Sequence, residues 1–115
     1  MISINPCNRF ELEGRVTNLK EYAPGKAADI TLAIDNGKDA NGKLKETTYL
    51  HTKCFTPAVY NTIVTGMKIH IFGHIGTSQY EKDGKKIYNT GLIDDYIVFL
   101  ESKAVVAARE AVKSL

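Results

Sequence analysis

Residues 66–100 constrain the fold more than any other part of the chain, because their pattern is that of one long β-hairpin. Apolar or small residues of the first arm recur at every second position, at Ile69, Ile71, Gly73 and Ile75. Asp83-Gly84 favours the positive φ angles of a tight turn between the two arms. Glycines weaken a flat strand, so Gly73 and Gly76 indicate points where the arm bends around a small barrel. We therefore predict a long, bent hairpin with a basic tip.

Length and composition indicate one globular domain. The chain has 115 residues, of which 43% are hydrophobic and 24% charged, enough to bury a core without covalent staples. Cys7 and Cys54 are too few for a disulfide framework, and we interpret both as free thiols. No apolar run approaches the roughly 18 residues of a membrane span, and residues 1–6 lack the features of a signal peptide. We expect a cytoplasmic protein with no membrane partner.

Two shorter strands are predicted before the hairpin. Apolar and polar residues alternate from Phe10 as a half-buried strand of about ten residues. A turn-rich loop at 20–29, centred on Pro24-Gly25, separates it from a second alternating segment at 30–34. The segment 37–46 predicts a second long hairpin loop, which is basic through Lys38, Lys43 and Lys45.

The strand predicted at 47–55 carries the most informative alternation. One face is small and apolar, with Leu50, Thr52 and Cys54. The other face is aromatic and basic, with Tyr49, His51, Lys53 and Phe55. Such a face is typical of a surface on which bases stack while a cation meets phosphate. The alternative places Tyr49 and Phe55 in the core, with Leu50 outside; the sequence favours the stacking interpretation.

A short helix is predicted after this strand. Thr56 and Pro57 are its N-cap and first residue, Val59 and Ile63 give it an apolar edge, and Gly66 ends it. The order is then three strands, a helix and two strands. That order predicts an all-β OB-fold, a five-stranded Greek-key barrel with a short helix between strands three and four, of the kind used to bind oligonucleotides.

The alanine-rich segment beyond the barrel predicts a C-terminal helix. Its apolar residues fall at helical spacing, at Val105, Ala108, Val112 and Leu115. We therefore divide the chain into an OB-fold domain at 1–101 and a helical extension at 102–115. The narrow stripe of small side chains leaves three alternatives: the helix packs weakly on the barrel, pairs with another subunit, or frays.

These pieces together resemble the bacterial and phage single-stranded DNA-binding protein family. The resemblance covers about residues 8–101 and is carried by the segments 8–16, 30–34, 46–49 and 66–75, with Tyr80 and Asp83-Gly84. It implies non-enzymatic, largely sequence-independent binding and protection of single-stranded DNA during replication or recombination, without a cofactor. The aromatic side chains that stack on bases in this family fall on Tyr49, Phe55 and Tyr80.

The chain also departs from the family pattern. It has no tryptophan, and residues 35–37 provide no aromatic side chain where the family has a fourth stacking residue, so stacking is expected to be weaker per protomer. The alanine-rich end replaces the acidic tail with which many bacterial members dock replication or recombination proteins. The short, tail-less form is similar to phage or mobile-element members, for which the host cytoplasm is the expected compartment.

Lysines of the two loops and of the third strand are the candidates for phosphate contact: Lys38, Lys43, Lys45, Lys53, Lys82, Lys85 and Lys86. His51, His70 and His74 are candidate base contacts. His70 and His74 would lie ~13 Å apart along a strand, too far to share a zinc ion. Asp94-Asp95 is explained most simply by a turn before Tyr96. We find no catalytic arrangement and predict neither an enzyme nor a metal site.

A small barrel covers few nucleotides, so we expect a homo-oligomer, a dimer or a tetramer, that presents several barrels to one strand. The alternative function is an OB-fold adaptor of the primosome type, whose main partner is a replication protein and whose DNA binding is accessory. Site size and affinity on oligo-dT with no partner present would discriminate the two.

Overall fold

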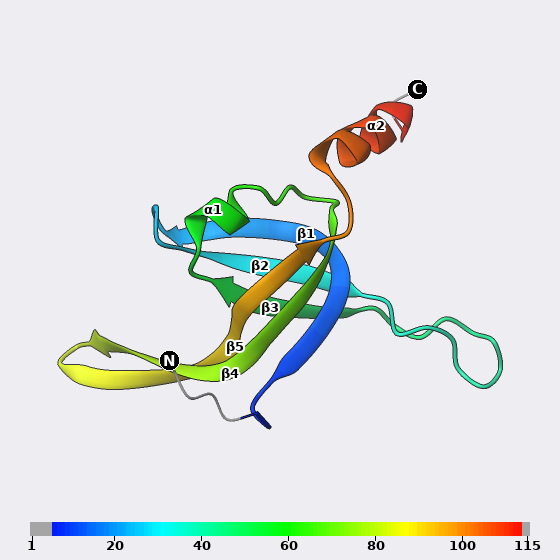
Figure 1. Ribbon diagram of the computed structural model, residues 1–115. Helices are drawn as coiled ribbons and strands as arrows, with labels where there is room; N and C mark the ends of the chain where they lie inside the picture. The colour runs from blue at the N-terminus through cyan, green and yellow to red at the C-terminus, as the bar shows by residue number, and fades with distance from the viewer. Residues whose placement is uncertain (1–5, 114–115) are drawn as a thin grey trace.

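The computed structural model describes residues 6–113, with the side chains of residues 78 and 80 excepted. Within this range five strands close into one barrel, in the order β1-β2-β3-β5-β4. The strands are β1 (Phe10–Ala23), β2 (Ala27–Ile34), β3 (Thr48–Cys54), β4 (Lys68–Lys82) and β5 (Lys85–Phe99). The helices are α1 (Pro57–Tyr60), between β3 and β4, and α2 (Lys103–Lys113), after β5 (Figure 1). The predicted all-β OB-fold is confirmed.

Closure of the barrel depends on a short seam. All the other neighbouring strands are antiparallel, whereas β3 and β5 run parallel and pair only at Thr52–Leu92 and Lys53–Ile93. β1 pairs with β4 through its first half and with β2 through its second half. Two register shifts in the β1–β2 ladder increase its curvature. This β3–β5 seam is therefore the shortest ladder in the barrel.

The core consists of inward side chains from the strands, and α1 closes one end. Its largest fully buried members are Val16, Ile30, Leu32, Thr52, Tyr60, Met67, Ile69 and Ile71. The Tyr60 hydroxyl donates a hydrogen bond to the Glu21 carboxylate, which raises the pKa of Tyr60 to about 12. α1 ends at Tyr60, so the prediction that it reaches Gly66 is wrong. Ile63 is nevertheless buried, because the turn after the helix returns it to the core.

The first connection is much shorter than predicted. β1 continues to Ala23 and β2 begins at Ala27, so the loop expected at 20–29 contains only residues 24–26. Lys20 pairs with Asp29 in the extended ladder. Polar side chains on the outside of a strand leave the same sequence pattern as a polar loop, which explains the error.

The long hairpin of β4 and β5 has the predicted turn, and its ladder has a register shift at one of the two predicted bends. Asp83 and Gly84 have φ angles of 55° and 78°. At the bend, Phe72 pairs with Tyr96 but Gly73 pairs with Asp94. A Cβ atom at Gly73 would lie 2.1 Å from the Ile93 carbonyl oxygen, so this bend requires glycine. No register shift occurs at Gly76.

Asp94 and Asp95 belong to this bend and not to a turn. Both lie within β5, and Asp95 is the residue that the register shift leaves without a partner in the ladder. The prediction of a turn before Tyr96 is therefore wrong. A bulge, like a turn, can place two adjacent polar residues outside the regular ladder. The sequence pattern therefore does not distinguish a bulge from a turn at this position.

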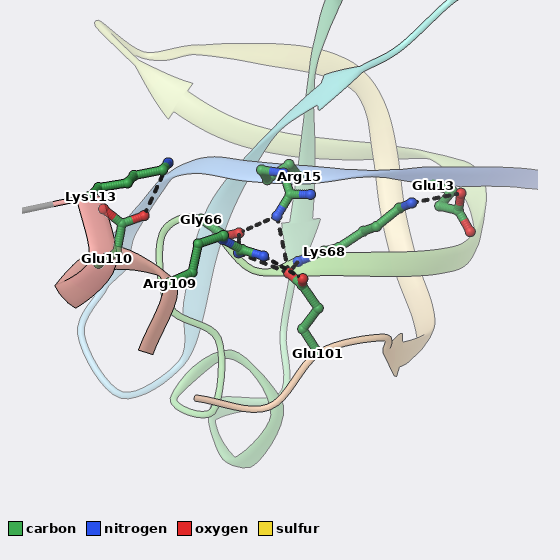
Figure 2. Close-up of polar contacts among 8 residues, drawn as sticks. All are labelled: Glu13, Arg15, Gly66, Lys68, Glu101, Arg109, Glu110 and Lys113. Atoms are coloured by element: carbon green, nitrogen blue, oxygen red, sulfur yellow. Dashed lines mark hydrogen bonds and ion pairs between the residues drawn. The ribbon is translucent and has the colours of Figure 1, made fainter. Parts of the chain in front are cut away.

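α2 packs on the barrel through a face other than the predicted stripe. Val106 is 4% exposed, whereas Val105 and Val112 are 51% and 67% exposed; Leu115 lies outside the described residues. A cluster of polar groups anchors α2 to the barrel. We call this cluster the Glu101 clamp; it consists of Arg15, Gly66, Glu101 and Arg109 (Figure 2). Of the helices described, none is long and apolar enough to span a membrane.

In the Glu101 clamp two guanidinium groups share two acceptors. Arg109 donates to Glu101 at 2.6 Å and to the Gly66 carbonyl at 2.9 Å, and Arg15 donates to the same carbonyl at 2.8 Å and to Glu101 at 3.1 Å. The hydrogen bond from Arg109 is the largest cause that lowers the pKa of Glu101, to about 2. The clamp therefore joins α2 to β1 and to the segment just before β4.

Candidate nucleic-acid interface

The outer surface of β3 exposes the predicted aromatic side chains. Tyr49 is 61% exposed and Phe55, just beyond the strand, is 49% exposed, while Thr52 and Cys54 are buried. The alternative that placed Tyr49 and Phe55 in the core is wrong. An exposed aromatic ring offers a π-face that any base can stack on.

β2 and the second half of β1 widen this surface. Lys53 lies opposite Asp29 on β2, which in turn lies opposite Lys20 on β1. Beside this row, the ring of Tyr22 lies 5.6 Å from Nζ of Lys53, within cation–π range. We define the platform as the outward side chains Tyr22, Tyr49, His51, Lys53 and Phe55.

Tyr22 is a platform residue that sequence reasoning missed. It was assigned to the loop at 20–29, but β1 continues through it and leaves it 43% exposed. Partial burial raises the pKa of its hydroxyl, and the Asp29 carboxylate raises it further. The signal available in the sequence was a tyrosine, a good strand former, directly before the tight turn at Pro24-Gly25. Tyr22 gives the platform a third described aromatic ring.

The predicted phosphate contacts lie mostly on two arms. Lys38, Lys43 and Lys45 lie on the exposed loop between β2 and β3, which a bridge between Lys38 and Leu44 narrows. Lys82, Lys85 and Lys86 lie at the tip of the β4–β5 hairpin. The two arms extend from the barrel in opposite directions, and β3 runs away from the loop arm (Figure 1). Of the seven predicted lysines, only Lys53 lies on the platform.

The backbone of Tyr80 pairs with Ile87, two pairs from the last pair of the hairpin. Its side chain lies outside what the structure describes. The assignment of Tyr80 to base stacking therefore stays a prediction.

The three histidines have different surroundings. His51 lies on the platform, with Nδ1 2.9 Å from Oγ1 of Thr31. His70 lies on β4 between two carboxylates of β1, 2.7 Å from Glu11 and 3.5 Å from Glu13. The structure brings only His51 to the platform, so base contact by His70 would require the DNA to pass a carboxylate-lined part of β4.

His74 pairs with Asp95 at 2.8 Å across β4 and β5. Base contact by this residue likewise remains a prediction. Among the described residues, no cluster of three or more His, Cys, Asp or Glu side chains could hold a metal ion.

A second aromatic group lies on the outer surface of β4 and β5. His70 stacks on Phe72 with ring centroids 4.7 Å apart, and Phe72 lies 6.3 Å from Tyr96. Phe72 and Tyr96 are 39% and 66% exposed. We call His70, Phe72 and Tyr96 the outer patch. The carboxylates Glu11 and Glu13 contact it through His70, which makes it a poor surface for phosphate.

A mostly buried carboxylate lies beneath the platform. Asp94, on β5, accepts a hydrogen bond from Oγ1 of Thr52 at 2.8 Å across the β3–β5 seam. Its other oxygen, Oδ1, has no partner among the described groups. Burial raises the pKa of Asp94 to about 7, and the nearby Asp95 adds to the rise. Sequence reasoning assigned Asp94 to a turn and did not predict its burial, because that burial depends on barrel closure.

Comparison with known proteins gives matches in structure only; no family model and no curated protein sequence matches the chain. The chain is similar to an SSB of Plasmodium falciparum in complex with single-stranded DNA, with a TM-score of 0.58 and 18% identity over 87% of this chain and 100% of that one. The mitochondrial single-stranded DNA-binding protein Rim1 of S. cerevisiae gives a TM-score of 0.58 at 14% identity, over 83% of this chain and 96% of that one.

A deletion mutant of the Thermus aquaticus single-stranded DNA-binding protein also gives a TM-score of 0.58, at 24% identity. There the match covers 84% of this chain but 52% of that one. The predicted resemblance is therefore confirmed at the level of the fold.

Proposed function

We propose that this chain binds single-stranded DNA, largely without regard to sequence, and that it has no catalytic role. The observation that carries the proposal is the platform: three exposed aromatic rings and a lysine on one outer face of a small barrel. Stacking on such rings contributes roughly 1–3 kcal/mol per base and tolerates every base. In a cell, this binding would protect strands exposed during replication or recombination.

The two arms supply the electrostatic part of the proposal. DNA that crosses the platform along β3 would meet lysines of the loop arm at one end and of the hairpin arm at the other (Figure 1). Each lysine that neutralises a phosphate releases condensed counterions, so binding should weaken as salt rises. The SSB of Plasmodium falciparum, of similar fold, is in complex with single-stranded DNA, which supports the proposal.

Titration of fluorescent oligo-dT, with melting curves measured in parallel, tests this function. Tyr49→Ala should lose roughly 1–3 kcal/mol of binding free energy and keep its melting temperature, because the ring is mostly exposed. Val112→Ala, on α2 and 67% exposed, is a control outside the platform and both arms. Oligo-dT binding by Tyr49→Ala that equals the wild type would exclude Tyr49 from the interface.

We also propose a homo-oligomer, a dimer or a tetramer, in which the outer patch contacts a second copy. Exposed aromatic rings rimmed by charges of both signs suit contact with protein. The rim contains Glu13 and Lys68, themselves 3.8 Å apart, so two copies related by a two-fold axis can pair opposite charges. Light scattering should show Tyr96→Ala at a lower mass than the wild type. A wild-type monomer at micromolar concentration would contradict the proposal.

The outer patch also favours a second candidate function, an adaptor of the primosome type. In that case the patch contacts a replication protein and DNA binding is accessory. The two functions predict different oligo-dT affinities for the chain alone. Tight, salt-dependent binding with a defined site size supports the first function, and weak binding without saturation supports the second.

A further inference from the structure

His51 is held in one orientation at the middle of the platform. Thr31 lies directly opposite on β2, and its Oγ1 is 2.9 Å from Nδ1 of the imidazole. Among the described residues the Thr31 hydroxyl has no other hydrogen-bond partner. A hydroxyl can donate or accept; where the Thr31 hydroxyl donates to Nδ1, the neutral imidazole carries its own hydrogen on Nε2.

In that tautomer, Nε2 is an oriented donor on an otherwise unselective surface. Nε2 of His51 has no partner in the part of the chain that the structure describes. The neighbouring side chains Tyr49 and Lys53 offer a π-face and a charge, which act on every nucleotide alike. An oriented N–H group differs from them because it can recognise a base edge.

The edges of the two pyrimidines differ at position 4, in addition to N3 and the C5-methyl group of thymine. Thymine has a carbonyl oxygen, an acceptor, where cytosine has an amino group, a donor. Guanine and adenine differ in the same way between O6 and N6. An N–H donor directed at this position forms a hydrogen bond with the carbonyl and opposes the amino group, while the stacking area of the pyrimidine ring stays nearly constant.

We propose that the Thr31 hydroxyl donates to Nδ1 of His51, and that the Nε2–H group of His51 gives the platform a preference for keto bases, thymine and guanine, over amino bases. The proposal rests on the proposed function, because it requires single-stranded DNA on the platform. One neutral hydrogen bond corresponds to about a two- to tenfold difference in affinity. The preference is therefore modest and adds to stacking and phosphate contact without replacing them.

The test compares oligo-dT with oligo-dC of equal length at one salt concentration. The quantity measured is the ratio of the two dissociation constants, Kd for oligo-dC over Kd for oligo-dT. His51→Ala should lower this ratio about two- to tenfold. Thr31→Val removes the hydroxyl at nearly constant shape and should lower the ratio similarly, whereas Thr31→Ser keeps the hydroxyl and should restore it. Melting curves confirm that each variant is folded.

The comparison of variants removes the intrinsic difference in flexibility between the two oligonucleotides. Tyr49→Ala is the matched control, because loss of a stacking ring should weaken both oligonucleotides and leave the ratio unchanged. A His51→Ala variant that binds both oligonucleotides with the wild-type ratio would overturn the base preference and leave the proposed function intact. An unchanged ratio in Thr31→Val would overturn the positioning role of Thr31. Wild-type protein that binds neither oligonucleotide would overturn the proposed function itself.

Discussion

Replacement of Asp94 by asparagine tests the energetics of the barrel seam. In the wild type, burial raises the pKa of this carboxyl group from its ordinary 3.8 to about 7. A group whose pKa is higher in the folded state stabilises the protein fully below its unfolded pKa, and that stability is lost as pH rises through the folded pKa. The wild type should therefore lose stability at Asp94 between about pH 4 and pH 7.

The size of this loss follows from the two pKa values. A change from 3.8 to about 7 corresponds to about 4 kcal/mol, at about 1.4 kcal/mol for each tenfold change in proton affinity. Because the carboxyl group is not completely buried, we expect about half of this, about 2 kcal/mol. The asparagine side chain has no charge to desolvate, and its carbonyl oxygen can accept the hydrogen bond from Thr52.

The assay is urea unfolding of the wild type and Asp94→Asn at pH 4.5 and pH 8. The difference in unfolding free energy, variant minus wild type, should increase by about 2 kcal/mol between the two pH values. Only the change of this difference with pH is informative. The asparagine variant also places an N–H group at the buried position of Oδ1, at a cost that does not depend on pH. Asp83→Asn, in the exposed hairpin turn, is the control and should show no comparable change. A difference for Asp94→Asn that is equal at both pH values would refute the reasoning.

Three further predictions concern the arms, the bend and the clamp. Replacement of Lys82, Lys85 and Lys86 together by alanine should weaken binding to all DNA sequences. The slope of log K against log salt should become less steep by about 0.7 for each phosphate that is no longer neutralised. Titrations at several salt concentrations measure this slope, and an unchanged slope would exclude the hairpin tip from the DNA interface. Gly73→Ala places a Cβ atom 2.1 Å from a carbonyl oxygen and should lower the unfolding free energy by about 1–3 kcal/mol or more, whereas Gly91→Ala, with nothing within 4 Å, should not. Glu101→Gln should lower the melting temperature at pH 7 but not near pH 2, because the pKa of Glu101 is lowered to about 2 and its stabilising effect is lost as pH falls through that value; equal melting temperatures at pH 7 would contradict a stabilising clamp.

Local patterns were sufficient to predict the OB-fold. Alternation at Ile69 and Ile71, the turn at Asp83-Gly84 and the Thr56-Pro57 helix start each depend on residues a few positions apart. The same holds for β3, where Tyr49 and Phe55 face outward because inward residues such as Thr52 alternate with them. Patterns of this kind can be recognised from the sequence alone, because strand period and turn geometry are local properties of the backbone.

Only the tertiary structure decided where long-range neighbours lie. Tyr22 joins the platform because β2 lies between β1 and β3, so that the Tyr22 ring on β1 comes near Lys53 on β3. Val106 is buried because the Glu101 clamp turns that side of α2 to the barrel. Asp94 is buried because β3 and β5 close the barrel over it. The position of each of these side chains depends on residues of other strands or helices. Strand register, bulges and barrel closure decide which of those residues come close, and a local sequence pattern carries no information about them.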